Sequence, residues 1–94
     1  MQQLATFTTT RLRPTEIAKE ASTATEVREA FFQFCAGSVP KKEVGLRMSR
    51  KGFAEDTVNL RAGLRKTSRR VYRFKFPDCG VAFVALHIGS TGES

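Results

Sequence analysis

The sequence predicts an α+β domain in which one long helix or two short helices pack on one face of an antiparallel sheet of about five strands. Three observations lead to this fold class. Apolar residues recur at helical spacing between residues 15 and 36, apolar and polar residues alternate along several segments after residue 44, and turn sequences separate some of those segments. The expected order is therefore one strand, the helical region and then four strands.

The first strand is expected over residues 4–12, which are rich in β-branched and apolar types and are followed by Pro14. In the helical region, Thr23 and Glu26 form a capping-box pattern. This region is therefore either one kinked helix or two helices that meet near residue 22, and Gly37 and Pro40 end it. Its apolar stripe consists of Ile17, Ala21, Ala24, Val27, Phe31 and Phe34.

The second half of the chain is expected to form four strands. Alternation predicts strands at 44–48, 58–64 and 71–76, and the almost continuous apolar run at 81–88 predicts a strand that is buried on both faces or lies at an interface. Residues 77–80 have the sequence of a tight turn, so residues 71–88 are predicted to form a hairpin. Residues 65–70 are expected to be a basic connection, and residues 89–94 a loose tail.

At 94 residues, the chain is expected to form a single domain, 1–94, and its small core favours a homodimer. No apolar run is long enough to span a membrane, and residues 1–13 lack the pattern of a secretory signal. We therefore expect a cytoplasmic or nuclear protein without a membrane partner. Cys35 and Cys79 are expected to be free thiols.

Positive charge is concentrated in one part of the sequence. The whole chain has a net charge of +7, but residues 41–75 hold 12 of the 16 Lys and Arg residues and only three of the nine acids, a net charge of +9. The remaining residues have a net charge of −2. Such an asymmetry favours a polyanionic partner.

Strand alternation predicts that the cations at 47, 61, 65, 73 and 75 lie on the sheet face opposite the helix, and that basic loops extend this face. The apolar residues expected to face the helix are Val44, Leu46, Met48, Val58, Leu60, Leu64, Tyr72, Phe74 and Phe76. The outward strand positions contain no acid, and an anionic partner would relieve the repulsion between neighbouring cations. The predicted nucleic-acid-binding residues are Arg47, Arg50, Lys51, Arg61, Arg65, Lys66, Arg69, Arg70, Arg73 and Lys75.

This pattern predicts that the chain is a small basic protein that binds RNA or DNA through contacts to the phosphate backbone. Its size suits a viral or phage accessory or regulatory protein. Because Tyr72, Phe74 and Phe76 are expected to face inward, no outward aromatic surface is available for bases to stack on. Duplex or structured nucleic acid is therefore favoured over sequence-specific binding of single strands.

The sequence predicts no catalytic residue, metal ligand or cofactor. His87 is the only histidine and is expected to be structural or interfacial, and the two cysteines are too far apart in the sequence to suggest a zinc site. The chain contains no P-loop, no glycine-rich dinucleotide motif and no nucleophile elbow.

Two alternatives remain open. Residues 70–76, followed by an apolar strand that ends at His87, resemble the end of the bacterial toxins that cut ribosome-bound messenger RNA, which are small basic α+β ribonucleases. This resemblance covers about a fifth of the chain. It implies that Tyr72, Arg73 and Arg61 would lie near the scissile phosphate, although the expected register turns Tyr72 inward. The other alternative is a dimeric interaction module for an acidic protein partner, with residues 81–88 at the dimer interface.

Overall fold

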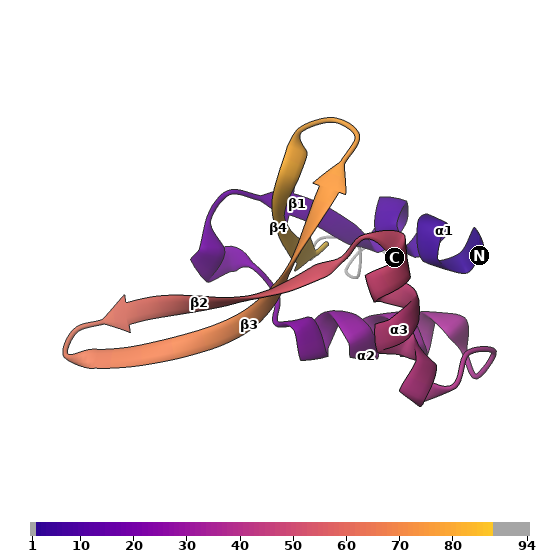
Figure 1. The fold of residues 1–94 in the computed structure, drawn as a ribbon, viewed down its shortest axis with the longest axis horizontal. Coiled ribbons are helices and arrows are strands. Elements are labelled where there is room, and N and C mark those ends of the chain that lie inside the picture. Colours follow the sequence, from indigo (N-terminus) through magenta and orange to yellow (C-terminus); the bar gives the residue numbers. More distant parts are fainter. Residues whose placement is uncertain (1, 88–94) are drawn as a thin grey trace.

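The computed structural model describes residues 2–87 and consists of three α-helices and a four-stranded antiparallel sheet with the strand order β1-β4-β3-β2 (Figure 1). The elements are α1 (Gln2–Arg11), β1 (Leu12–Thr15), the 3-10 turn η1 (Ala18–Glu20), α2 (Ala24–Cys35), α3 (Lys41–Lys51), β2 (Ala54–Ala62), β3 (Arg65–Phe76) and β4 (Gly80–Leu86). The α+β class and the antiparallel sheet are confirmed. The expectation of about five strands with one or two helices is wrong, and the predicted tail at 89–94 lies outside the described residues.

The first segment is a helix and not the predicted strand. Its threonine hydroxyls donate to carbonyls one turn earlier, from Thr8 to Leu4 at 2.8 Å and from Thr10 to Thr6 at 2.7 Å. Leu4 and Phe7 lie on the same side of this helix and are each 1% exposed, so core packing outweighs the β propensity of the threonines. The chain then enters β1, which pairs with β4 and contains Pro14.

Residues 44–48 also belong to a helix, where alternation had predicted a strand. Val44 and Met48 are buried at i and i+4, whereas Leu46, which the alternation placed in the core, is 57% exposed. The helix ends at Gly52, which has a φ of +116° and whose N–H donates to the Ser49 carbonyl at 3.1 Å.

The capping box predicted at Thr23 begins α2. The Thr23 hydroxyl accepts from the Glu26 N–H at 3.1 Å, and the Glu26 carboxylate accepts from the Thr23 N–H at 3.0 Å. The helical structure expected between residues 15 and 22, either as part of one kinked helix or as a first short helix, is wrong, because the chain forms only the short turn η1 there.

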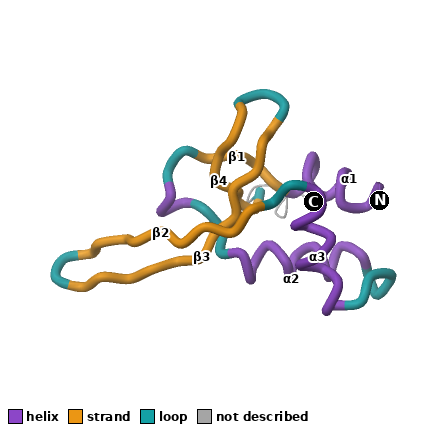
Figure 2. Tube along the Cα trace, viewed as in Figure 1, coloured by secondary structure: helices purple, strands orange, loops and turns teal. Residues whose placement is uncertain are grey.

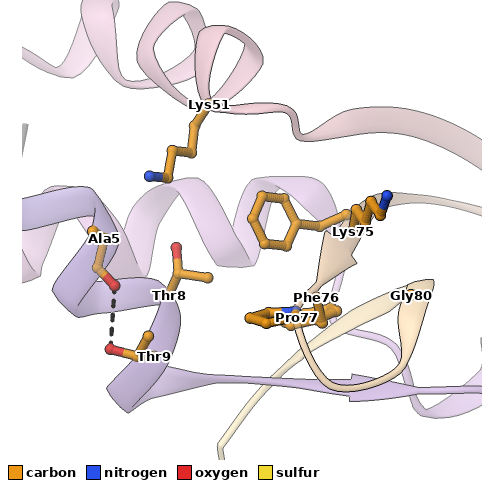
Figure 3. A pocket seen from close by; sticks show the side chains of 9 residues that line it. Ala5, Thr8, Thr9, Lys51, Lys75, Phe76, Pro77 and Gly80 are labelled. Atoms are coloured by element: carbon orange, nitrogen blue, oxygen red, sulfur yellow. Dashed lines mark hydrogen bonds between the residues drawn. The ribbon is translucent and has the colours of Figure 1, made fainter.

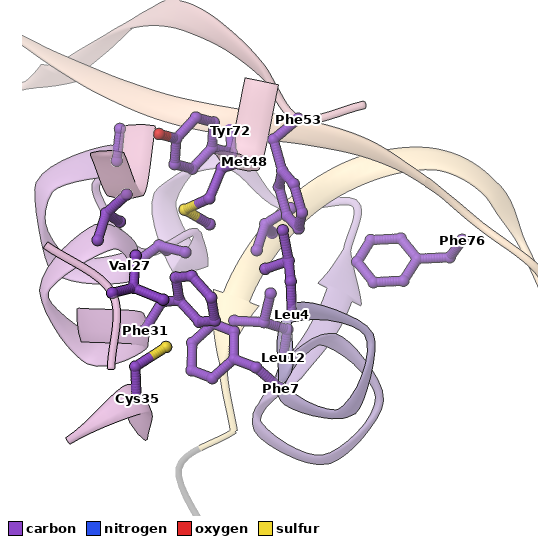
Figure 4. Close-up of a cluster of buried hydrophobic side chains, with 14 of the residues drawn as sticks. Leu4, Phe7, Leu12, Val27, Phe31, Cys35, Met48, Phe53, Tyr72 and Phe76 are labelled. Carbon is purple, nitrogen blue, oxygen red and sulfur yellow. The ribbon is translucent and has the colours of Figure 1, made fainter. Parts of the chain in front are cut away.

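The core lies where α1, α2 and α3 meet the body of the sheet (Figure 4). Phe31 from α2 is 0% exposed, and its ring centroid lies 5.2 Å from that of Phe7 in α1. Met48 joins them from α3, and Tyr72 and Val84 join them from the sheet. The inward orientation predicted for Tyr72 is thereby confirmed, since only 2% of this residue is exposed.

The predicted hairpin between β3 and β4 is also confirmed through residue 86. β4 lies between β1 and β3 in the sheet order: its residues 80–83 pair with β3 and its residues 83–86 pair with β1, and Val84 and Ala85 are buried on opposite faces. Within residues 2–87, no helix is both long enough and apolar enough to cross a bilayer.

Candidate nucleic-acid interface

The outer part of the β2–β3 hairpin projects from the body of the protein as a two-stranded ribbon (Figure 2). We call residues 57–70 the arm. Six residues of β2, 57–62, extend over about 20 Å at roughly 3.3 Å per residue. The connection predicted at 65–70 is wrong, since these residues belong to β3, and the loop is the pair Gly63-Leu64. Gly63 has a φ of +63° at the position where a type II′ turn requires glycine.

The arm contributes nothing to the hydrophobic core. None of its side chains that the structure describes is buried, and Leu64 at the tip is fully exposed. The expectation that Val58, Leu60 and Leu64 face a helix is wrong, because no helix packs on this part of the ribbon. An isolated two-stranded ribbon is at best marginally stable. Core packing therefore does not explain the length of the arm.

The register between β2 and β3 sorts the arm residues onto two faces. Thr57 pairs with Arg70, Asn59 with Ser68 and Arg61 with Lys66, and directly opposite residues share a face. We call the face formed by these six residues the polar face. The reverse face carries Val58, Leu60, Arg65, Thr67 and Arg69. The predicted placement of Arg61, Arg65, Arg73 and Lys75 on one face is therefore wrong, because Arg61 lies opposite to the other three.

Acidic residues neutralise the root of the arm. Glu55 lies 3.0 Å from the Arg28 guanidinium and 3.7 Å from that of Arg70, and Asp56 lies 3.7 Å from that of Arg73. β2 begins earlier than predicted and includes both acids, so the expectation of strands without outward acids is wrong at the root.

Arg28 also donates to the Tyr72 hydroxyl at 3.1 Å, so α2 is tied to the root of the arm through both Glu55 and Tyr72. This hydrogen bond raises the pKa of Arg28, and burial raises the pKa of Tyr72. An arginine is charged and a tyrosine hydroxyl is protonated at neutral pH even at their ordinary pKa values, and both shifts move these titrations further from neutral pH. The two contacts of Arg28 thus join the root of the arm to α2.

The outer end of the arm differs from the root in the partners of its cations. Among the residues that the structure describes, no carboxylate pairs with Arg61, Arg65 or Lys66. Arg61 and Lys66 lie directly opposite each other, an arrangement that destabilises a ribbon. The arm as a whole holds five cations and no acid. Its unneutralised positive charge therefore increases from the root toward the tip.

Arg69 has a structural role. Its Nη1 donates to the backbone carbonyls of Lys19 at 3.1 Å and Ala21 at 2.9 Å, across nearly fifty residues of sequence. These contacts attach β3 to the segment that leads into α2. Sequence reasoning grouped Arg69 with the surface cations because the sequence does not reveal such a long-range backbone contact.

Replacing Arg69 by alanine is expected to lower the free energy of unfolding by about 1.5 kcal/mol, because a charged donor to two carbonyls is lost. The matched control is Arg70→Ala at the next position. Arg70 is well exposed and has only the 3.7 Å ion pair, so its loss should cost less than about 0.5 kcal/mol. Urea unfolding followed by circular dichroism measures both, and equal losses would show that the Arg69 contacts do not stabilise the fold.

The remaining predicted cations lie on the body. Arg47 is in α3, where its Nη2 lies 3.2 Å from the Glu43 carboxylate, and Arg50 and Lys51 end the same helix. Lys51 and Lys75 line a mainly apolar cavity of about 650 Å³ between α1, the end of α3 and the β3–β4 turn (Figure 3). The predicted set is thus divided between the arm, its root and the region around α3.

The structure does not bring together the three residues that the ribonuclease resemblance implies. Tyr72 is buried, Arg73 lies on the opposite face of the same strand, and Arg61 is six ladder positions from Tyr72, or about 20 Å. The cavity beside Lys51 and Lys75 has no acid or histidine in its lining. Within residues 2–87, no group of three or more His, Cys, Asp or Glu side chains could hold a metal ion.

Comparison of the chain with protein-family models, curated proteins and solved structures found no match.

Proposed function

We propose that this protein binds nucleic acid and that the arm is its main contact. The observation that carries the proposal is a projecting ribbon with five cations, no acid and no buried side chain among those described. Repulsion between Arg61 and Lys66 would be relieved by phosphate groups, which also release counterions when cations neutralise them. RNA and DNA both present such a backbone.

The test is fluorescence anisotropy with labelled single- and double-stranded RNA and DNA over a series of salt concentrations. The test variant carries Arg61→Gln, Arg65→Gln and Lys66→Gln. Its affinity is expected to fall by about 10- to 100-fold at low salt, and its salt slope by about 0.9 for each duplex phosphate contact that is lost.

The control variant removes the same charge from the helices, with Arg11→Gln, Lys41→Gln and Lys42→Gln. These exposed residues belong to α1 and α3, so the affinity should change by less than about threefold if the arm is the contact. Equal losses in the two variants would mean that net charge alone drives binding. Affinity no tighter than about 10⁻⁴ M for all four probes at physiological salt would overturn the proposal.

A further inference from the structure

The polar face of the arm contains six side chains in three cross-strand pairs, and each of the six can form hydrogen bonds. They are Thr57, Asn59, Arg61, Lys66, Ser68 and Arg70. If the arm were only an electrostatic contact, lysine and arginine would be sufficient. Asn59 and Ser68 add no charge, yet they lie together at the centre of this face.

We propose that the polar face enters the major groove of B-form duplex DNA and contacts the edges of the bases there. This inference rests on the proposed function and names its ligand class. The major groove, about 12 Å wide, admits a two-stranded β-ribbon, and each base pair presents a distinct set of donors and acceptors in it. Asparagine matches the N6 and N7 atoms of adenine, arginine and lysine match the O6 and N7 atoms of guanine, and serine and threonine suit several bases.

The shape of the arm fits this groove in two further respects. The arm is about 20 Å long, and all six side chains of its polar face are exposed, so this face is open to an approaching groove. Arg65 lies on the reverse face and remains available for the phosphates along the groove wall. A-form RNA has a deep, narrow major groove that does not admit a ribbon, so duplex RNA is expected to bind more weakly.

A substitution of Asn59 distinguishes contacts to bases from contacts to phosphates, because this side chain is uncharged. It is exposed, and its replacement by alanine leaves the charge of the arm unchanged. Thr67→Ala is the matched control, since Thr67 is an exposed polar residue of the reverse face whose hydroxyl donates to the Leu60 carbonyl at 3.3 Å.

The experiment selects duplex DNA from a library with a randomised core, using the full chain, and then measures affinity for the selected duplex and for a shuffled duplex of the same composition. The wild-type protein is expected to enrich a motif. Asn59→Ala should weaken binding of the selected duplex by about 5- to 100-fold and leave the shuffled duplex within about twofold. Thr67→Ala should leave both within about twofold.

Three results would overturn this inference and leave the proposed function standing: no enriched motif, equal effects of Asn59→Ala on the two duplexes, or duplex RNA bound as tightly as the selected DNA. Binding of an acidic polypeptide such as polyglutamate, together with no binding of any nucleic acid, would overturn both proposals. Circular dichroism melting of each variant tests whether a loss of affinity comes from unfolding.

Discussion

Replacing Phe31 by alanine is expected to lower the free energy of unfolding by about 3 to 5 kcal/mol. The side chain is completely buried, and its ring packs against that of Phe7, so the substitution leaves a cavity between α1 and α2. A domain of this size has a total stability of only about 5 to 14 kcal/mol at roughly 0.05 to 0.15 kcal/mol per residue. Much of the stability, and in a marginal case most of it, would be lost.

Urea unfolding followed by circular dichroism at 25 °C measures this loss. Leu64→Ala is the control, because it also truncates a large apolar side chain but at the fully exposed tip of the arm. It should change the free energy of unfolding by less than about 0.5 kcal/mol. Similar losses for the two variants would contradict the position of the core described above.

The sequence predicted α2 well because two independent signals agree there. The apolar stripe through Val27 and Phe31 gives the helical period, and the Thr23–Glu26 capping box marks the first turn. Neither signal depends on distant parts of the chain. The β3–β4 hairpin was predicted for the same reason, since Pro77 to Gly80 specify a turn locally.

The two helices that were predicted as strands show where local patterns are ambiguous. Val44, Leu46 and Met48 satisfy alternation, but Val44 and Met48 also satisfy the i, i+4 spacing, and burial of this second pair decides the structure. In α1, three consecutive threonines favour a strand, and only the burial of Leu4 and Phe7 against α2 selects the helix. Such long-range packing is not visible in one sequence.

The charge of the candidate site was predictable, whereas its geometry was not. Counting residues located the cations between 41 and 75. Alternation of Leu60, Ala62 and Leu64 carried the predicted strand through the turn at Gly63-Leu64, and this error in the turn placed Arg65 on the same face as Arg61. Pairing outward from a two-residue turn at Gly63 would have revealed the polar face and Asn59 within it.

Removing the outer arm is expected to separate binding from folding. In this variant, Asn-Gly replaces residues 59–68 and closes a short hairpin between Val58 and Arg69, which already lie directly opposite each other. Arg69 keeps its contacts to Lys19 and Ala21, and no side chain described as buried is removed. The free energy of unfolding should therefore change by less than about 1 kcal/mol.

The affinity of the shortened protein for nucleic acid should fall to the level of non-specific attraction, about 10⁻⁴ M at physiological salt. Anisotropy titration measures this, and the Arg11, Lys41 and Lys42 triple variant controls for the loss of three positive charges. If the shortened protein kept its affinity, the cations around α3 would be the contact instead of the arm. If it failed to fold, the arm would have a structural role that its exposed side chains do not suggest. We expect the shortened protein to fold stably and to lose specific binding, because the fold does not depend on the outer part of the arm.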